Sequence, residues 1–347
     1  MRIAFVNSTH KWGGVKTWTL ELAVGLQQRF NISSMIIGRQ KEFLTRAKEL
    51  GLKARPFSFG PDYNPKAVCQ FIKLFKREKI THIVVNVGKD MRTAGIGAKL
   101  LGIPVLHRVG LPGDMKDKFD VRLMYKWIRP KLIVPCEFIK QGLLQNLPFL
   151  HSENVKVIYT GKEACPFPPQ RVNVPLQFIS TSQLNPDKGH QDVLRALALL
   201  KKRGVTFHYH VLGTGKSQQK LQQLALELDL KDRITWYGFQ KDVRKFLRRA
   251  DVFILASYSE GLPNSLLEAM AEGLVCVSRN VGGIKEVWPN GLEALLFSRQ
   301  TSLEELANLL IYVANMDLLT TKRIFWKNSQ GYYGNMLQEF KRFLTER

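Results

Sequence analysis

The segment that most constrains the fold is residues 257–271, SYSEGLPNSLLEAMA, which follows the apolar run ADVFILA. Such a short apolar run predicts a buried strand, and Pro263 suits the first position of a helix because its missing N–H is not needed there. The N–H groups of Asn264, Ser265 and Leu266 then have no intrahelical acceptor. With the positive end of the helix dipole, they predict an anion-binding site at this helix start.

Two carboxylates flank the predicted anion site. Glu260 comes just before the helix, and Glu268 lies five residues into it, which is roughly 8 Å from the helix start at about 1.5 Å per residue. Such a distance can separate a diphosphate from the ribose hydroxyls of one nucleotide. The pattern therefore outlines a nucleotide-sugar site. The alternative is an ordinary strand-to-helix turn with incidental glutamates.

Short β-branched runs alternate with longer amphipathic stretches along the whole chain, which is typical of parallel α/β layers. The predicted strands are RIAFVN, SMIIG, HIVVNV, IPVLH, KLIVPC and VKVIY in the first half, and LQFISTS, FHYHVLG, RITWYG, DVFILAS and LVCVSR in the second. Between the two sets, residues 165–175 contain four prolines and predict a stiff interdomain linker. We expect two doubly wound domains, each binding ligands beyond the carboxyl ends of its strands.

SYSEGLPNSLLEAMA resembles the signature of retaining glycosyltransferases of family four (glycosyl transferases group 1), in which two glutamates separated by seven residues flank the donor-binding helix start. The downstream VCVSRNVGGIKEV, a strand followed by a Gly-Gly turn, is similar to that family too. The resemblance implies the GT-B fold, with two Rossmann-like domains facing each other across a cleft. Residues 1–170 would form the acceptor-side domain and 171–327 the donor-binding domain, and a helix over 328–347 would pack back on the first.

The resemblance also implies roles for individual residues of the second domain. Glu268 would hold the ribose and Glu260 would contact the donor sugar. The diphosphate of the donor would lie against the N–H groups at the helix start. The segment residues expected to contact the donor are Gly261, Leu262, Asn264, Ser265 and Leu266.

The loop LNPDKGH follows the predicted strand LQFISTS, and its Lys188 can reach a leaving diphosphate as a point charge. In the family, an arginine and a lysine at this place both bind the phosphates of the donor. Lys188 matches the lysine, but Gln183 stands where the family usually has the arginine. This departure removes a positive charge that can be worth about 3–4 kcal/mol in a barrier. Gln183 is thus a donor-side residue whose effect on turnover stays open.

In the first half, Gly13 and Gly14 follow the first strand and precede a helix, so they permit close approach of the backbone to a ligand. They resemble the family's glycine loop, which faces the diphosphate and donor sugar. His107 ends the strand IPVLH. The resemblance implies a position near the donor sugar and a catalytic role, whereas a histidine at a strand end is otherwise usually structural.

A further glycine pair, Gly213 and Gly215 in GTGKS, resembles the end of a P-loop, but His210 stands where that motif needs a glycine. We therefore reject an ATP-binding loop. The family places a glycine-rich turn here beside the donor, and both glycines fit it. Tyr237 resembles the family segment that packs the nucleotide base, although it could equally belong to the core.

Charge is the most unusual feature of the composition. The formal net charge is +23, and residues 1–170 carry 28 Lys and Arg against 12 Asp and Glu, or +16. Such an excess favours an anionic partner. The segments 71–80 and 122–133 mix cations with aromatic and aliphatic residues, which suits an anionic membrane surface. The alternative is that both are helices with one face in the core and one in solvent.

No nucleic-acid-binding module is visible, so we do not expect a nucleic-acid partner. The four cysteines have no paired spacing for zinc or a redox pair, and no Asp-x-Asp pair is present to hold a metal on a diphosphate. We expect no metal and no cofactor beyond the nucleotide diphosphate sugar as co-substrate. The start MRIAFVNSTH predicts a strand rather than a signal peptide.

These observations predict a retaining, metal-independent glycosyltransferase in the cytoplasm, peripheral on the inner face of the cytoplasmic membrane. Its acceptor is expected to be a glycan or membrane-associated glycolipid, such as a lipopolysaccharide core intermediate. The alternative is a nucleotide-sugar-binding protein with weak or lost turnover, because of Gln183. The base, the sugar and the oligomeric state are left open by the sequence.

Overall fold

The computed structural model describes residues 1–10 and 12–346, which form two compact units. The first unit consists of residues 1–160 and 335–347, and the second of residues 161–334. Each contains one parallel sheet with helices on both faces. The predicted architecture of two doubly wound α/β domains is confirmed.

The first unit has a seven-stranded parallel sheet in the order β3-β2-β1-β4-β5-β6-β7. The strands are β1 (Arg2–Asn7), β2 (Ser33–Gly38), β3 (Lys53–Pro56), β4 (His82–Val85), β5 (Val105–Arg108), β6 (Lys131–Val134) and β7 (Val155–Val157). Ile3 to Val6 of β1 are wholly buried, as expected for a central strand covered on both faces. The order reverses between β1 and β4, where loops at the carboxyl edge diverge.

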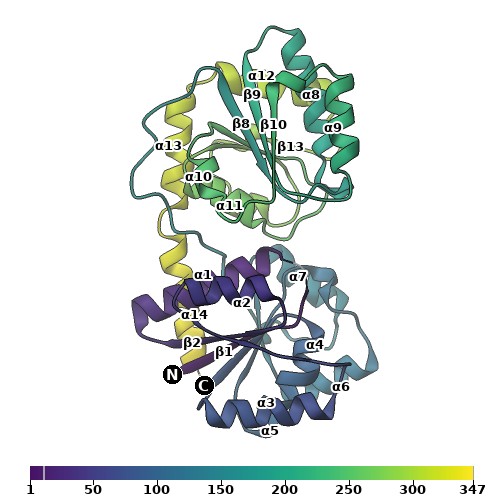
Figure 1. Ribbon diagram of the computed structural model, residues 1–347, viewed down its shortest axis with the longest axis vertical. Coiled ribbons are helices and arrows are strands. Elements are labelled where there is room, and N and C mark those ends of the chain that lie inside the picture. The colour runs from purple at the N-terminus through teal and green to yellow at the C-terminus, as the bar shows by residue number, and fades with distance from the viewer. Residues whose placement is uncertain (11, 347) are drawn as a thin grey trace. The chain divides into compact units, whose positions relative to one another are not determined.

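The helices of the first unit cover both faces of this sheet. They are α1 (Gly14–Phe30), α2 (Lys41–Glu49), α3 (Pro65–Arg77), α4 (Gly88–Asp90), α5 (Ile96–Leu100), α6 (Phe119–Ile128) and α7 (Glu137–Asn146), with a π-helical turn at Met91–Gly95. Helices α1 and α2 lie on one side of the sheet, and α3 and α5 on the other (Figure 1).

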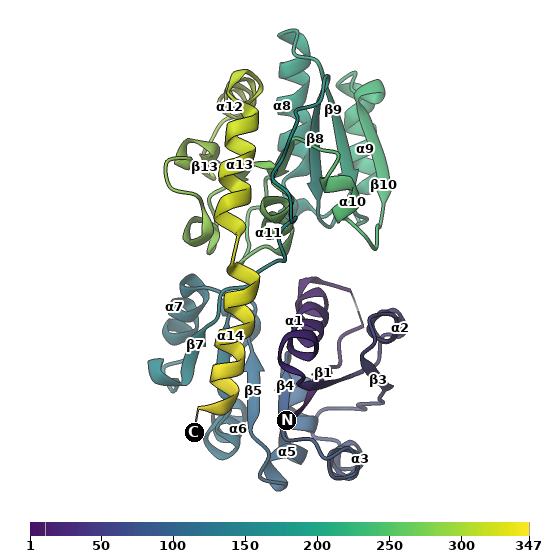
Figure 2. The same ribbon diagram turned by 90° about the vertical axis from the view of Figure 1, so that its left-hand side faces the viewer.

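The last helix, α14 (Tyr332–Thr345), places residues 335–347 in the first unit. It lies beside α1 (Figure 2), where Phe340 makes an edge contact with Trp18 at 6.3 Å between ring centroids. Lys341 Nζ also lies 4.5 Å from the centre of the Phe30 ring. Buried aromatic packing therefore holds the end of the chain on the first sheet.

The second unit has a six-stranded parallel sheet in the order β10-β9-β8-β11-β12-β13. Its strands are β8 (Leu176–Thr181), β9 (Phe207–Leu212), β10 (Ile234–Gly238), β11 (Val252–Leu255), β12 (Val275–Arg279) and β13 (Leu296–Phe297). Its helices are α8 (His190–Lys202), α9 (Gln218–Glu227), α10 (Arg244–Leu247), α11 (Asn264–Ala271), α12 (Leu303–Asn315) and α13 (Leu318–Ser329). Helices α8, α9 and α12 pack together on one face, and α10, α11 and α13 on the other.

The proline-rich segment 165–175 differs from the predicted linker, and the units divide before it rather than at residue 170. Cys165 N donates to Ala271 O of α11, and the backbone oxygen of Cys165 accepts from Trp326 Nε1 of α13, both at 2.8 Å. Lys322 Nζ, also on α13, donates to Arg171 O at 3.1 Å. The segment is a packed strap of the second unit, because its backbone hydrogen bonds are made there.

Two strands were missing from the sequence prediction. β3 reads KARP and contains little apolar sequence, and β13 is only two residues long. Both lie at sheet edges, where less burial is required of the side chains. None of the helices in residues 1–10 and 12–346 is both long and apolar enough to cross a membrane.

Candidate active site

The start of α11 lies at the carboxyl edge of the second sheet, after β11 and the loop 256–263. Pro263 is the N-cap, one position earlier than predicted, and its carbonyl accepts from Leu267 N at 3.3 Å. The N–H groups of Asn264, Ser265 and Leu266 therefore precede the first intrahelical bond, as predicted. No acceptor for them is found among the described residues. The helix presents three free donors at its positive end.

The Gly-Gly turn after β12 fixes the loop that precedes α11. Gly282 has a φ of +62°, and a Cβ there would lie 2.2 Å from the Glu260 carbonyl oxygen and 2.5 Å from that of Gly261. Gly283 N donates to Gly261 O at 2.7 Å. Only glycine permits both the left-handed backbone and this close approach. The turn thereby sets the direction of the Glu260 backbone.

Lys188 and Glu260 meet in the structure, although they are 72 positions apart in the sequence. Lys188 Nζ donates to Glu260 Oε1 at 2.7 Å, and both side chains are mostly buried. Gly189, with a φ of +66°, packs against the backbone of Ala256, and Tyr258 N donates to Asp187 O at 2.8 Å. These contacts bring the loop after β8 against the loop after β11. A cation and a carboxylate are therefore held together beside the start of α11.

Gln183 lies in the same loop after β8, with an exposed side chain whose Oε1 accepts from Asn185 Nδ2 at 2.9 Å. The two glycines after β9 support this loop. A Cβ at Gly213 would lie 1.9 Å from Ser182 O, and one at Gly215 would lie 2.4 Å from Leu184 O. The glycines thus allow the loops after β8 and β9 to pack backbone against backbone.

Glu268 pairs with Lys162, a residue that the sequence did not single out. Its Oε1 lies 3.1 Å from Nζ of Lys162, whose side chain is only 1% exposed. Buried lysines are retained when paired, because an isolated buried charge is costly. Lys162 precedes the proline-rich strap and belongs to no motif, so only the tertiary contact identifies it.

A second residue that the sequence did not single out is Arg279, which is buried at the end of β12 and contacts the loop before α11. Its Nη2 donates to Asp192 Oδ2 at 2.8 Å, and its Nε to Ala256 O at 3.1 Å. The guanidinium carbon lies 4.2 Å from the centre of the Tyr258 ring. An arginine inside an apolar strand was the sequence signal that could have indicated such a support.

Tyr237 is the penultimate residue of β10, and its hydroxyl lies 3.1 Å from His210 Nδ1. Its ring makes an edge contact with Phe246 at 4.7 Å between centroids. Burial, with a smaller effect of His208, lowers the pKa of His210 to about 4.

Leu262 is buried, so the segment 260–266 contributes an apolar side chain to the core as well as polar groups.

The candidate residues of the first unit occupy two places at the carboxyl edge of its own sheet. Gly13 is the N-cap of α1 and Gly14 its first residue, with open space around a Cβ at Gly13. His107 is a buried residue within β5, and its Nδ1 makes a short hydrogen bond with Tyr125 OH of α6. Burial lowers the pKa of His107 to about 4, so its ring is neutral at pH 7.

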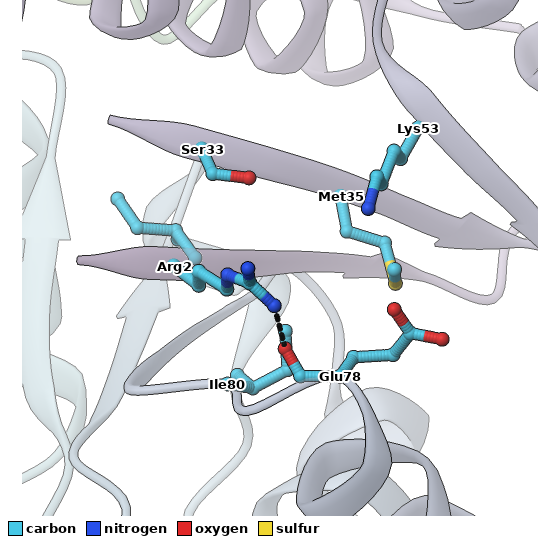
Figure 3. Close-up of a pocket in the computed structure, with 7 residues that line it drawn as sticks. Arg2, Ser33, Met35, Lys53, Glu78 and Ile80 are labelled. Atoms are coloured by element: carbon cyan, nitrogen blue, oxygen red, sulfur yellow. Dashed lines mark hydrogen bonds between the residues drawn. The ribbon is translucent and has the colours of Figure 1, made fainter. Parts of the chain in front are cut away.

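A small depression lies at the opposite, amino-terminal edge of the first sheet (Figure 3). It is lined by Arg2, Ile3, Ser33, Met35, Lys53, Glu78 and Ile80. Arg2 Nη1 donates to Glu78 O at 3.0 Å there. Ligands of doubly wound sheets bind at the carboxyl edge, so this depression is not the candidate site. Within residues 1–10 and 12–346, no group of three or more His, Cys, Asp or Glu is arranged to hold a metal ion.

Comparison with known proteins finds a family match over most of the second unit. Residues 163–329 match the family described as glycosyl transferases group 1, and this range falls within the second unit. The amylovoran biosynthesis glycosyltransferase AmsK of Erwinia amylovora is 35% identical over 121 residues, which cover 33% of this chain and 30% of AmsK. The chain spans 42% or less of the length of the curated relatives that match it at 33–35% identity.

A UDP-Gal:alpha-D-GlcNAc-diphosphoundecaprenol alpha-1,3-galactosyltransferase of Escherichia coli matches over a longer range. It is 23% identical, and the match covers 80% of this chain and 76% of that protein. Among solved structures, a glycosyltransferase of Rickettsia africae superposes with a TM-score of 0.81 at 19% identity, covering 99% of this chain and 97% of that one. HepE of Anabaena, solved in complex with UDP-glucose, superposes with a TM-score of 0.78 at 18% identity, covering 99% of both chains. At these identities the superpositions show the fold alone.

The family match and the fold agree with the resemblance that SYSEGLPNSLLEAMA carries, which is thereby confirmed. Residues 163–329 of the chain match the glycosyl transferases group 1 family, and the fold is that of the GT-B glycosyltransferases.

Proposed function

We propose that the protein is a retaining glycosyltransferase that moves a sugar from a nucleotide diphosphate sugar to an acceptor, without a metal ion. The observation that carries this proposal is the Lys188–Glu260 pair, 2.7 Å apart beside the start of α11. A cation, a carboxylate and three free N–H donors at one edge of the sheet suit a ligand with an anionic diphosphate and a polar sugar.

In this proposal the diphosphate lies against the N–H groups of Asn264, Ser265 and Leu266 and takes Lys188 as its counter-ion. Glu260 then contacts the donor sugar. Glu268, held by Lys162 at 3.1 Å, accepts hydrogen bonds from the ribose. The chemistry is largely electrostatic, because stabilising the leaving diphosphate is the main demand of glycosyl transfer.

Metal independence is part of the proposal because the chain supplies its own positive charge. In this scheme Lys188 and the positive end of the α11 dipole lie where the leaving diphosphate binds, and they stabilise its negative charge. The sequence also contains no Asp-x-Asp pair, which metal-dependent glycosyltransferases use to hold a cation on the diphosphate. The proposal also includes the donor-side roles that the resemblance implies for His107, Gly13 and Gly14. His107 has Tyr125 as a hydrogen-bond partner.

The acceptor that we propose is a membrane-associated glycolipid, met by a protein peripheral on the inner face of the cytoplasmic membrane. The formal charge of +16 on residues 1–170 favours an acceptor or surface with phosphate groups. Relatives support the same class: one is named for a GlcNAc-diphosphoundecaprenol substrate, and another, of Escherichia coli, is a lipopolysaccharide 1,6-galactosyltransferase that is 30% identical over 125 residues.

The test is a panel of UDP-, GDP- and ADP-sugars with lipid-linked and soluble acceptors, assayed with and without EDTA. We expect transfer that EDTA leaves unchanged and a product that keeps the anomeric configuration of the donor. Lys188→Met should abolish transfer, and circular dichroism should show that the variant is folded. Inversion of configuration, or loss of activity in EDTA, contradicts the proposal.

Gln183 favours a second candidate, a nucleotide-sugar-binding protein with weak turnover. Its side chain is exposed, so Gln183→Arg should be accommodated with a change in stability within about 0.5 kcal/mol. If the missing charge limits catalysis, the substitution should raise kcat by about tenfold or more. A fall in kcat with unchanged nucleotide affinity would show instead that the glutamine is specialised for this donor.

A further inference from the structure

Helix α6 of the first unit leaves an apolar stripe uncovered. Its buried face consists of Val121, Met124, Tyr125 and Ile128. On the outer face, Phe119, Leu123 and Trp127 are 78%, 51% and 46% exposed. Spaced four residues apart, these three side chains lie on one side of the helix over about 12 Å. We call them the α6 stripe.

Cations surround the α6 stripe. Residues 116–129 contain five Lys or Arg against two Asp. Both carboxylates already have partners: Asp117 accepts from Arg122 at 2.5 and 2.6 Å, and Asp120 accepts from Tyr63 OH at 2.9 Å. The remaining cations are Lys116, Lys118, Lys126 and Arg129, and all of them are exposed. Within the described residues, no carboxylate lies within salt-bridge distance of these four.

The other segment that mixes cations and aromatics, residues 71–80, is different. Its apolar residues Phe71, Leu74, Phe75 and Ile80 are buried in the core of the first unit. It is thus a helix with one buried and one solvated face, as the alternative interpretation of the sequence held. The structure thus distinguishes two segments that look alike in sequence: of the two, α6 is the one with large apolar side chains exposed.

We propose that the α6 stripe and its cations dock the first unit on an anionic bilayer, with Phe119, Leu123 and Trp127 entering the headgroup region. This inference rests on the proposed function in one respect, since a membrane-associated acceptor gives the docking its use. Exposed aromatic and aliphatic side chains flanked by Lys and Arg bind anionic interfaces through apolar burial and charge attraction together. The structure shows this combination on α6.

A bilayer suits the α6 stripe better than a second protein does. A stable protein interface buries about 800 Å² on each partner, which exceeds what three side chains on one helical face can supply. A bilayer needs only a few inserted side chains and a cationic surround. The four cations without a carboxylate partner would also repel the same face of a second copy.

The experiment is co-sedimentation of the full chain with vesicles of phosphatidylcholine alone or mixed with phosphatidylglycerol. We expect binding to the anionic vesicles that weakens with salt. Phe119→Ser with Trp127→Ser should weaken it by about a hundredfold, about tenfold for each aromatic. The matched control is Phe167→Ser with Tyr312→Ser, two aromatics of the second unit that are 73% and 55% exposed.

A second pair of variants tests the charge. Lys118→Gln with Lys126→Gln should weaken binding to anionic vesicles by roughly thirtyfold, at about fivefold for each charge. Lys220→Gln with Lys231→Gln, which removes two exposed lysines of the second unit, should have little effect. Equal loss in the two pairs would show that net charge, and no particular face, drives the binding.

Docking is overturned if wild-type protein binds both vesicle types equally or neither, or if Phe119→Ser with Trp127→Ser changes the sedimentation mass and not vesicle binding. In the latter case the face joins copies of the chain.

Thermal shifts with nucleotides should be unchanged in all α6 variants, which controls for folding. Vesicle binding through α6 without sugar transfer would refute the proposed function alone. Transfer to soluble acceptors without vesicle binding would refute the docking alone.

Discussion

The Lys188–Glu260 pair leads to an unusual expectation: removing a negative charge from the candidate site should tighten donor binding. Lys188 Nζ donates to Glu260 Oε1 at 2.7 Å in the ligand-free structure. An entering diphosphate must compete with this carboxylate for the lysine. Glu260→Gln keeps the shape of the side chain but weakens its hold on Lys188. Nucleotide diphosphates should therefore bind the variant more tightly, although transfer should fall if Glu260 contacts the donor sugar.

The magnitude follows from the change in the interaction between the two side chains. Lys188 keeps its charge in the variant, so a hydrogen bond can remain, but the attraction between two opposite charges is lost. For a pair near the protein surface that attraction is worth about 1 kcal/mol, and more for side chains that are mostly buried, as these are. Replacing the carboxylate by an amide thus releases about 1–1.5 kcal/mol of competition. This corresponds to about a tenfold decrease in Kd.

Isothermal titration with UDP, GDP and ADP measures the effect, and the corresponding nucleosides serve as uncharged ligands. Nucleoside affinity should not change in Glu260→Gln. In a Lys188→Met background, the same substitution should change diphosphate affinity much less, because no lysine is left to release. Glu293→Gln, at an exposed carboxylate of the second unit, controls for net charge. Unchanged or weaker diphosphate binding in Glu260→Gln would refute the reasoning, as would an equal gain in both backgrounds.

Two further predictions concern the frame of each unit. Gly282→Ala should impair nucleotide binding and lower stability by about 1–3 kcal/mol, because its Cβ would meet the Glu260 carbonyl oxygen at 2.2 Å. The control is Gly291→Ala, at a φ of +82° with open space around the Cβ, which should show backbone strain without loss of nucleotide binding. Calorimetry measures the stability of both variants, and nucleotide titration measures their binding. The pKa of His107 is lowered from 6.5 to about 4 by burial, so the unfolded chain takes up this proton first as pH falls. His107 should therefore contribute a loss of about 2 kcal/mol of stability between pH 7 and pH 5, and urea unfolding should show it as the difference between wild type and His107→Gln, since Asp90, whose pKa burial raises to about 6, acts in the opposite direction in both proteins.

The sequence determined the fold class and the position of helix α11. Each β-branched run and each amphipathic stretch is a local pattern, and their alternation permits few architectures. SYSEGLPNSLLEAMA likewise contains its strand, turn and helix start within one short segment. Among the strands of the described residues, the edge strands β3 and β13 were missed, because short edge strands carry little apolar sequence.

The tertiary structure decided which side chains meet. Lys188 and Glu260 come together only because the loops after β8 and β11 share one edge of the sheet, and Lys162 reaches Glu268 across a longer separation. The proline-rich strap was predicted as a linker because its composition is that of one, yet Trp326 and other residues of α13 satisfy its backbone. Composition and periodicity describe neighbours along the chain, whereas pairing and burial depend on contacts between distant segments. For the same reason, only the folded first unit could show that α6 keeps its apolar stripe in solvent while residues 71–80 bury theirs.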